Sequence, residues 1–347
     1  MIIDERYMRR ALQLARQGAG HTSPNPMVGA VIVGPDGTII GEGWHRKCGE
    51  GHAEVNAVAS VCDADLLRDS TLYVTLEPCS HYGKTPPCAR LIIERGIPRV
   101  VVGCLDPFKE VSGRGVAMLR EAGVEVVVGV LEQECRALNR RFMTAHTTGR
   151  PWIQLKWAQT ADGFIALPAD AGENPLHMST PVTMRLMHRQ RALCDAIVVG
   201  ANTARIDNPS LTTRYWPGSN PLRVVLSRGL TVPDSLTLLT DGLPTIVYNG
   251  VKNGTEGAVE YVKMDTSQPQ SWLQDLYRRG VTSVMVEGGT QVLQQLIDAH
   301  AWDEARIEVS PRQVGQGVPA PVIDGQMTAR HAIDGNQITY CHRSDIN

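Results

Sequence analysis

The chain has 347 residues, more than one average domain, so two domains are the starting expectation. Hydrophobic residues make up 42% and charged residues 20%, a balance that excludes a disordered chain and allows real cores. The formal net charge of −2 provides no basic field for nucleic acid, and no stretch has the apolar length of a signal peptide or a membrane span.

The first half alternates predicted helices and strands. An amphipathic helix is predicted over residues 4–17, and further helices over 52–59, from about 87, over 114–121 and over 132–145. Buried strands are predicted over 28–33, 71–77, 99–102 and 124–128. This order implies a layered α/β domain with a largely parallel core.

A short polar stretch at 147–151, Thr-Thr-Gly-Arg-Pro, is the best candidate boundary, and we predict domains over 1–147 and 148–347. A second α/β series follows it. Strands are predicted over 152–158, 195–200, 222–227, 245–249 and 283–287, and helices over 181–192, over 271–279 and from 290. The polar residues 249–270 are predicted to be rich in loops.

The eight cysteines are scattered along the chain without an export signal, which predicts reduced thiols and a cytoplasmic location. Five have apolar or helical neighbours and are predicted to pack as small hydrophobes: Cys62, Cys104, Cys135, Cys194 and Cys341.

The strongest chemical signal is His52-Ala53-Glu54, followed by Pro78-Cys79 and then Cys88. One imidazole and two thiolates suit tetrahedral zinc with water in the fourth position, and zinc lowers the pKa of that water toward ~7. Glu54 lies at the start of the same predicted helix as His52, where it can carry the proton from water to a leaving amine. The order His-x-Glu, then Pro-Cys, is typical of zinc nucleobase deaminases. We therefore predict one Zn²⁺ per chain with Glu54 as the catalytic residue.

Two alternatives remain for these residues. A closed structural zinc site would need a fourth protein ligand, for which His45, Cys48 or His81 could be proposed. A chance cluster would not be expected to place His-x-Glu at a helix start and Pro-Cys just after a buried strand.

Eight residues, SHYGKTPP, separate Cys79 from Cys88, where editing and free-nucleoside deaminases usually have about two to four. This insertion, with PNPMVG at 24–29, GWH at 43–45 and GHAE at 51–54, resembles the deaminase domain of the bifunctional riboflavin-biosynthesis proteins of the RibD/RibG type. The resemblance implies a cytidine-deaminase-like three-layer α/β domain. It also implies a substrate that is a diaminopyrimidine carrying a ribosylamino 5′-phosphate. The positions that match the family's substrate pocket are Asn25, His45, Lys84 and Asp106.

An amide suits base edges, and His and Lys suit phosphate. The chain departs from the family at Phe108, where many members carry Asn, which puts one polar contact in doubt.

The second half has no Gly-x-Gly-x-x-Gly fingerprint. It does have a predicted strand that ends in Gly288-Gly289 before a helix, a turn that exposes N–H groups to phosphate. With the LKWA run at 155–158 and the segments 200–203 and 207–214, this turn resembles the reductase domain of the same family, which has a dihydrofolate-reductase-like α/β fold.

The resemblance implies contacts to NADPH and to the ribosyl phosphate. The implied NADPH contacts are Ala158, His177, Thr203, Asp207, Ser227, Gly288, Gly289 and Thr290. The implied substrate contacts are Lys156, Arg191, Leu211, Arg214 and Glu287. Two arginines suit a phosphate ester, and Ser227 with Arg228 would receive the cofactor's 2′-phosphate. Hydride would pass from the nicotinamide to C1′ of the opened ribose, with Lys156 acting near that carbon or serving as an ordinary ion-paired lysine.

Pro175 and His177 stand where the family has Ser and Trp, which puts two cofactor contacts in doubt.

Four interpretations compete. The leading one is a bifunctional deaminase and NADPH-dependent reductase that acts on a small pyrimidine ribosyl phosphate, binds neither nucleic acid nor membrane, and forms a homo-oligomer, most simply a dimer. The second keeps the deaminase and makes the C-terminal half a degenerate binding or oligomerisation module. A nucleic-acid-editing deaminase is disfavoured by the charge and by only three Phe. A structural zinc protein would leave Glu54 without a purpose.

Overall fold

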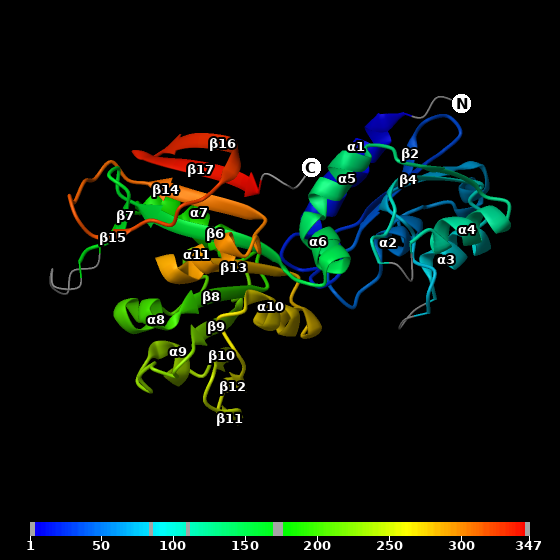
Figure 1. Cartoon of the computed structure of the whole chain (residues 1–347). Helices are drawn as coiled ribbons and strands as arrows, with labels where there is room; N and C mark the ends of the chain where they lie inside the picture. The colour runs from blue at the N-terminus through cyan, green and yellow to red at the C-terminus, as the bar shows by residue number, and fades with distance from the viewer. Residues whose placement is uncertain (1–3, 83–85, 109–111, 169–175, 344–347) are drawn as a thin grey trace. The chain divides into compact units, whose positions relative to one another are not determined.

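The computed structural model describes residues 4–82, 86–108, 112–168 and 176–343. The chain divides into two compact units, Met1–Gly149 and Arg150–Asn347 (Figure 1). Within the described ranges, no helix is both long enough and apolar enough to cross a membrane.

The N-terminal unit is built on a five-stranded sheet with the order β2-β1-β3-β4-β5. Its strands are β1 (Gly29–Val33), β2 (Ile39–Trp44), β3 (Thr71–Leu76), β4 (Arg99–Cys104) and β5 (Glu125–Val128). β3, β4 and β5 run parallel, whereas β1 pairs antiparallel with both β2 and β3. The prediction of a largely parallel core is therefore correct for one side of the sheet and wrong for the other.

The helices of this unit are α1 (Glu5–Ala15), α2 (Ala53–Ala59), α3 (Cys88–Glu94), α4 (Arg114–Glu121), α5 (Glu132–Leu138) and α6 (Arg140–Thr148), with short 3-10 turns at Arg16–Gly18 and Ala64–Asp69. The single helix predicted over 132–145 is two helices that meet at Asn139. The amide of Asn139 accepts a hydrogen bond from Met27 N at 2.9 Å and donates to Met27 O at 2.8 Å. This long-range contact holds Asn139 in place between the two helices.

The strands alternate their side chains between two cores, as the two-residue period of a strand requires. Ala30 and Ile32 of β1 belong to a core shared with α2, α3 and α4. Val31 and Val33 belong to a second core shared with α1, α5 and α6. Helices thus cover both faces of the sheet, which confirms the predicted three-layer α/β fold.

β2 was not predicted, because its sequence Ile-Ile-Gly-Glu-Gly-Trp lacks a clear apolar pattern. Its glycines have a packing reason. A side chain at Gly43 would lie 2.3 Å from the backbone nitrogen of Ala57, and one at Gly41 would lie 2.7 Å from Ala57 O. The backbone of α2 therefore rests directly on β2.

The C-terminal unit contains a ten-stranded sheet with the order β11-β12-β10-β9-β8-β13-β6-β14-β17-β16. Its strands are β6 (Trp152–Gln159), β8 (Ala196–Gly200), β9 (Leu222–Ser227), β10 (Thr245–Asn249), β11 (Gly254–Glu256), β12 (Val259–Lys263), β13 (Ser283–Gly288), β14 (Glu304–Val309), β16 (Gly325–Ile333) and β17 (Asn336–Arg343). A separate two-stranded sheet joins β7 (Phe164–Ala166) to β15 (Val318–Pro319). The strands from β12 to β14 in the sheet order run parallel, so their carboxyl ends share one edge.

The helices of this unit are α7 (Pro181–Arg191), α8 (Ala201–Asp207), α9 (Thr237–Thr240), α10 (Pro269–Arg278) and α11 (Thr290–Asp298). α10 and α11 pack their apolar residues on one face of the sheet, while α8 and α9 pack on a second core. α7 makes polar contacts to the sheet: Thr183 donates to Glu308 at 2.6 Å and Gln190 to Tyr340 at 2.9 Å.

Two predictions about local structure were wrong. Residues 249–270 contain β11 and β12 and are not merely loops. All three residues of β11 are exposed, so the segment has no apolar pattern. Cys62 is exposed, whereas the other four cysteines predicted to pack in a core are buried.

Candidate active sites

Three side chains distant in sequence form a compact cluster in the N-terminal unit. His52 is the N-cap residue of α2, Cys79 follows β3, and Cys88 is the first residue of α3. His52 Nδ1 lies 3.6 Å from Cys79 Sγ and 3.4 Å from Cys88 Sγ. In a tetrahedral zinc site with Zn–S of about 2.3 Å and Zn–N of about 2.0–2.1 Å, sulfur and nitrogen lie about 3.5 Å apart. The cluster therefore fits a zinc ion as it stands.

The cluster has three protein ligands among the described residues. Cys48 and His81, considered above as a fourth ligand, are both exposed. His45 is held elsewhere, with Nδ1 at 3.2 Å from Gly51 O and Nε2 at 3.4 Å from Asn25 Nδ2. Three protein ligands and one open position are typical of a catalytic zinc site, not a structural one.

The two thiols carry unequal proton affinities. The hydrogen bond between them lowers the pKa of Cys79 and raises the pKa of Cys88. Because zinc binds thiolates, metal binding must displace the proton from Cys88.

Glu54 lies beside the cluster in the first turn of α2 and is only 3% exposed. Burial and, to a lesser extent, the negative charge of Cys79 raise its pKa to about 7, against the opposing charge of His52. A carboxyl group with a pKa near neutrality can both accept and return a proton, as a general acid–base catalyst must.

The structure describes three of the four residues predicted to bind the pyrimidine substrate. Burial lowers the pKa of His45. Its ring is thus kept uncharged, a state better suited to orienting Asn25 than to binding phosphate. Burial raises the pKa of Asp106, whose Oδ1 accepts a hydrogen bond from Phe108 N at 2.9 Å. Lys84 lies outside the described residues.

Phe108, which replaces the family's Asn, packs on α6. Its ring meets that of His146 edge-on, with centroids 5.7 Å apart, and His146 in turn meets Phe142 at 4.4 Å. Phe108 thus makes an aromatic contact at this position.

In the C-terminal unit, Arg191 is buried and paired with Glu287 of β13. Its Nη2 lies 2.9 Å and 3.0 Å from the two carboxylate oxygens, and Nε lies 3.2 Å from Oε1. Nη1 donates to Thr212 O at 2.7 Å. Arg191 is therefore not part of a solvated helix face. Its contact with the substrate phosphate stays a prediction, and Glu287 is the residue that would orient the guanidinium.

Lys156 of β6 lies near this pair and is partly buried. Burial lowers its pKa, and the charge of Glu287 opposes the shift. Lys156 makes no ion pair within the described ranges, and its role near the reacting carbon stays a prediction.

His188 was missed by the sequence analysis. It is 1% exposed, and its Nδ1 has no hydrogen-bond partner among the described residues. Burial and the positive charges of Arg191 and Arg214 lower its pKa to about 4. The spacing of three residues to Arg191 was the available signal, because it places both side chains on one face of α7.

Arg214 and Leu211 lie in the segment after α8. Arg214 is exposed, donates to Ser210 Oγ at 2.9 Å, and lies over the ring of Tyr215 at 4.9 Å. Leu211 has a φ of 52° and a buried side chain, so its backbone is the part available to a ligand.

Two of the predicted cofactor residues meet at the glycine turn after β13. A side chain at Gly289 would lie 3.2 Å from Thr203 Oγ1, and Gly288 has a φ of 138°. The turn lies at the N-terminus of α11, where N–H groups are free for phosphate. Asp207 follows Thr203 by one helical turn and is exposed, and partial desolvation by its surroundings raises its pKa.

The other predicted cofactor residues show different environments. Thr290 Oγ1 donates to Pro319 O at 2.7 Å. Ser227 is buried, and its Oγ accepts from Thr231 N at 3.0 Å, so the neighbouring exposed Arg228 is the freer group.

Ala158 is half-buried on β6. His177 is exposed, and its charge acts on Asp207. Pro175 lies outside the described residues.

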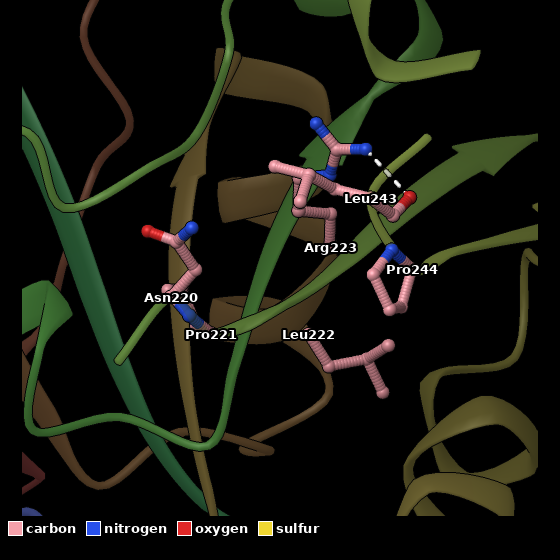
Figure 2. A pocket seen from close by; sticks show the side chains of 6 residues that line it. All are labelled: Asn220, Pro221, Leu222, Arg223, Leu243 and Pro244. Carbon is pink, nitrogen blue, oxygen red and sulfur yellow. Dashed lines mark hydrogen bonds between the residues drawn. The ribbon is translucent and has the colours of Figure 1, made fainter. Parts of the chain in front are cut away.

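A small pocket elsewhere in this unit is not part of these sites. It lies at the amino ends of β9 and β10, the opposite edge of the sheet from the Gly288–Gly289 turn (Figure 2). Its lining is Asn220, Pro221, Leu222, Arg223, Leu243 and Pro244. Arg223 is already engaged there by Asp241, at 2.6 Å and 2.7 Å.

Comparison with known proteins covers both units. Residues 1–104 match the family model of the cytidine and deoxycytidylate deaminase zinc-binding region, and residues 151–340 match that of the RibD C-terminal domain. The riboflavin biosynthesis protein RibD of Aquifex aeolicus is 40% identical over 323 residues, covering 91% of this chain and 89% of the relative. The RibD protein of Bacillus amyloliquefaciens is 40% identical over 337 residues, covering 93% and 89%.

Solved structures agree with these relatives. The diaminohydroxyphosphoribosylaminopyrimidine deaminase/5-amino-6-(5-phosphoribosylamino)uracil reductase of Thermotoga maritima is 37% identical, covers 98% of each chain and superposes with a TM-score of 0.88. RibD of Acinetobacter baumannii is 29% identical, covers 98% of this chain and 99% of its own, and superposes with a TM-score of 0.89.

Proposed function

Because the chain belongs to the RibD family of riboflavin-biosynthesis enzymes, which combine a deaminase with a reductase, we propose how its residues divide these two activities. Deamination belongs to residues 1–147 and reduction to residues 148–347. The observation that carries the deaminase assignment is the three-ligand cluster with the buried Glu54 beside it. The family match of both halves favours this interpretation over a degenerate C-terminal module, a nucleic-acid editor or a structural zinc protein.

The substrate of the first reaction is 2,5-diamino-6-ribosylamino-4(3H)-pyrimidinone 5′-phosphate. His52, Cys79 and Cys88 would hold the zinc ion, which when bound would make a water molecule available for attack on the ring at neutral pH. Glu54 takes the proton from that water and gives it to the departing amine, so ammonia leaves and a carbonyl remains. The pKa of Glu54, about 7, supports both transfers.

The substrate-side residues orient the pyrimidine. Asn25 offers an amide to the base, with its Nδ2 directed at the uncharged ring of His45. Asp106 binds a donor group of the substrate, and Lys84 binds the phosphate.

The second reaction reduces the ribosyl chain to ribityl. When bound, NADPH would supply the hydride for C1′ of the opened ribose. Lys156 provides positive charge or a proton near that carbon. Two observations support this role: Lys156 is partly buried, and it makes no ion pair among the described residues. Arg214, exposed at the edge of the site, binds the phosphate together with Arg191, which Glu287 holds in place.

Residues at the carboxyl edge of the sheet would hold the cofactor. The Gly288–Gly289 turn beside Thr203 would bind its pyrophosphate, and Arg228 and Ser227 would bind its 2′-phosphate. The cofactor would have further contacts with Ala158, His177, Asp207 and Thr290. Leu211 would donate a backbone hydrogen bond to the substrate. A homodimer and a cytoplasmic location complete the proposal.

One experiment tests both halves. Ammonia release and NADPH oxidation are followed together in purified, zinc-loaded protein supplied with the diaminopyrimidine ribosyl phosphate. NADPH consumption that begins after ammonia appears supports the proposed order. Ammonia without NADPH consumption would contradict the reductase assignment, and NADH oxidised as fast as NADPH would contradict the 2′-phosphate site.

A further inference from the structure

One buried carboxylate in the deaminase unit has no part in the chemistry above. Glu77 follows β3 and directly precedes Pro78 and Cys79. It is 5% exposed, and its carboxylate accepts four hydrogen bonds, all from backbone N–H groups. A carboxylate buried in this way is a structural anchor, because its charge is balanced by the dipoles that it binds.

The four N–H groups belong to two places in the chain. Oε2 accepts from Asp106 N at 3.2 Å and from Gly113 N at 2.9 Å. Oε1 accepts from Gly115 N at 2.9 Å and from Val116 N at 3.2 Å. The N-cap residue of α4, Gly113, has no side chain to satisfy the first turn. Glu77 performs this capping from a distant part of the sequence, with its negative charge at the positive end of the helix.

The same contact joins α4 to the zinc-binding turn. A side chain at Gly115 would lie 2.0 Å from Pro78 O, so the first turn of α4 lies directly against the residue that precedes Cys79. Glu77 N also donates to Cys104 O at 2.9 Å, which fixes the start of the turn to β4. Glu77 is therefore bound on both its backbone and its side chain.

We propose that Glu77 is a positioning residue of the deaminase, which holds Asp106 and the first turn of α4 in register with the zinc ligand Cys79. The inference rests on the proposed role of Asp106 as a substrate contact. Among the described residues, the Glu77 carboxylate binds backbone N–H groups and neither the zinc-ligating atoms nor Glu54. Its loss is therefore expected to weaken substrate binding and to spare proton transfer.

The test compares Glu77→Gln with Glu132→Gln. The first variant keeps the size of the side chain but replaces one acceptor oxygen by an amide that faces N–H groups. The second removes a carboxylate whose contact is an exposed ion pair with Arg136 in the same unit. Loss of this anchor should displace the substrate contact Asp106 by a fraction of an ångström. We therefore expect Glu77→Gln to raise the KM for the diaminopyrimidine about ten-fold and to leave kcat within about three-fold of the control. Zinc content, and NADPH oxidation with the deaminated pyrimidine, should match the control.

Amide hydrogen exchange gives a readout independent of turnover. Exchange at Gly113, Gly115 and Val116 should be faster in Glu77→Gln than in the control. An unchanged KM, unchanged exchange, or a kcat that falls together with zinc content would each overturn the proposal. If Glu77→Gln does not fold, Glu77→Asp keeps the charge on a shorter side chain and must show the same rise in KM. If the unmodified protein releases no ammonia, the proposed function fails, while amide exchange still decides the role of Glu77.

Discussion

Replacement of Glu54 by glutamine should abolish most deamination and, in the same protein, stabilise the metal-free N-terminal unit at alkaline pH. Glutamine has nearly the shape of glutamate but neither accepts nor returns a proton. Loss of a general acid–base catalyst predicts a kcat for ammonia release lowered about 10²–10⁴-fold. The zinc ligands His52, Cys79 and Cys88 are untouched, so zinc content should stay the same.

The gain in stability follows from the burial of Glu54. Its pKa rises from the ordinary 4.5 to about 7 in the folded protein, so ionisation opposes folding once the pH exceeds 4.5. The folded state binds more protons than the unfolded state between these values, and stability falls as the pH rises through 7. The resulting penalty is about 3 kcal/mol at pH 8 and below about 1 kcal/mol at pH 5. Glutamine carries no such penalty.

Calorimetric unfolding of the metal-free proteins measures this difference. A change of about 3 kcal/mol in a unit of this size raises Tm by about 6–12 °C at pH 8, with most of the gain gone at pH 5. Glu50→Gln, at an exposed position of the same unit, is the control. An equal gain at both pH values would refute the reasoning from burial, and ammonia release at a near-normal rate would refute the catalytic role of Glu54.

Four further predictions concern the reductase site, the zinc site and one ion pair of the C-terminal unit. Arg214→Ala should raise the KM for reduction at least about ten-fold and leave ammonia release unchanged, as coupled assays of both steps would show; equal loss of both would argue against separate sites. Removal of zinc by a chelator should stop ammonia release but not NADPH oxidation with the deaminated pyrimidine. Zinc titration of the metal-free protein in buffers of different ionisation enthalpy should show proton release, because the raised pKa of Cys88 keeps that thiol protonated; zinc uptake without proton release would contradict this. Asp303→Ala should destabilise the C-terminal unit by about 3–5 kcal/mol, because it removes a buried carboxylate that binds the half-buried Arg150 at 2.6 Å and 2.8 Å and the backbone of Ile153 at 2.7 Å; a loss under about 1 kcal/mol in denaturant unfolding would refute this.

The zinc site was predictable because its members lie in short, contiguous patterns. His52 and Glu54 are two residues apart at a helix start, and Cys79 and Cys88 flank a loop of distinctive length. Local sequence patterns of this kind also predicted most helices and buried strands. The predictions failed where a contact from far along the chain decides the local structure, as when Asn139 binds the backbone of Met27.

The reductase site shows the same limit in its side chains. Arg191 stands among other arginines on a helix, and sequence alone does not distinguish a solvated arginine from one paired with Glu287, 96 residues later. His188 and Glu77 were missed for a similar reason. Their roles depend on what the fold places around them, and no short motif marks them.

The close approach of α2 to β2 has a genetic consequence. Any residue larger than glycine at position 43 would bring its Cβ to 2.3 Å from Ala57 N, so α2 would have to move, and His52 and Glu54 would move with it. A missense allele at Gly43 would thus retain every catalytic and zinc-binding residue in the sequence, displace two of them, and so deprive its host of riboflavin. A second-site suppressor mutation that shifts α2 should restore activity to such an allele, whereas a change among the zinc ligands should not.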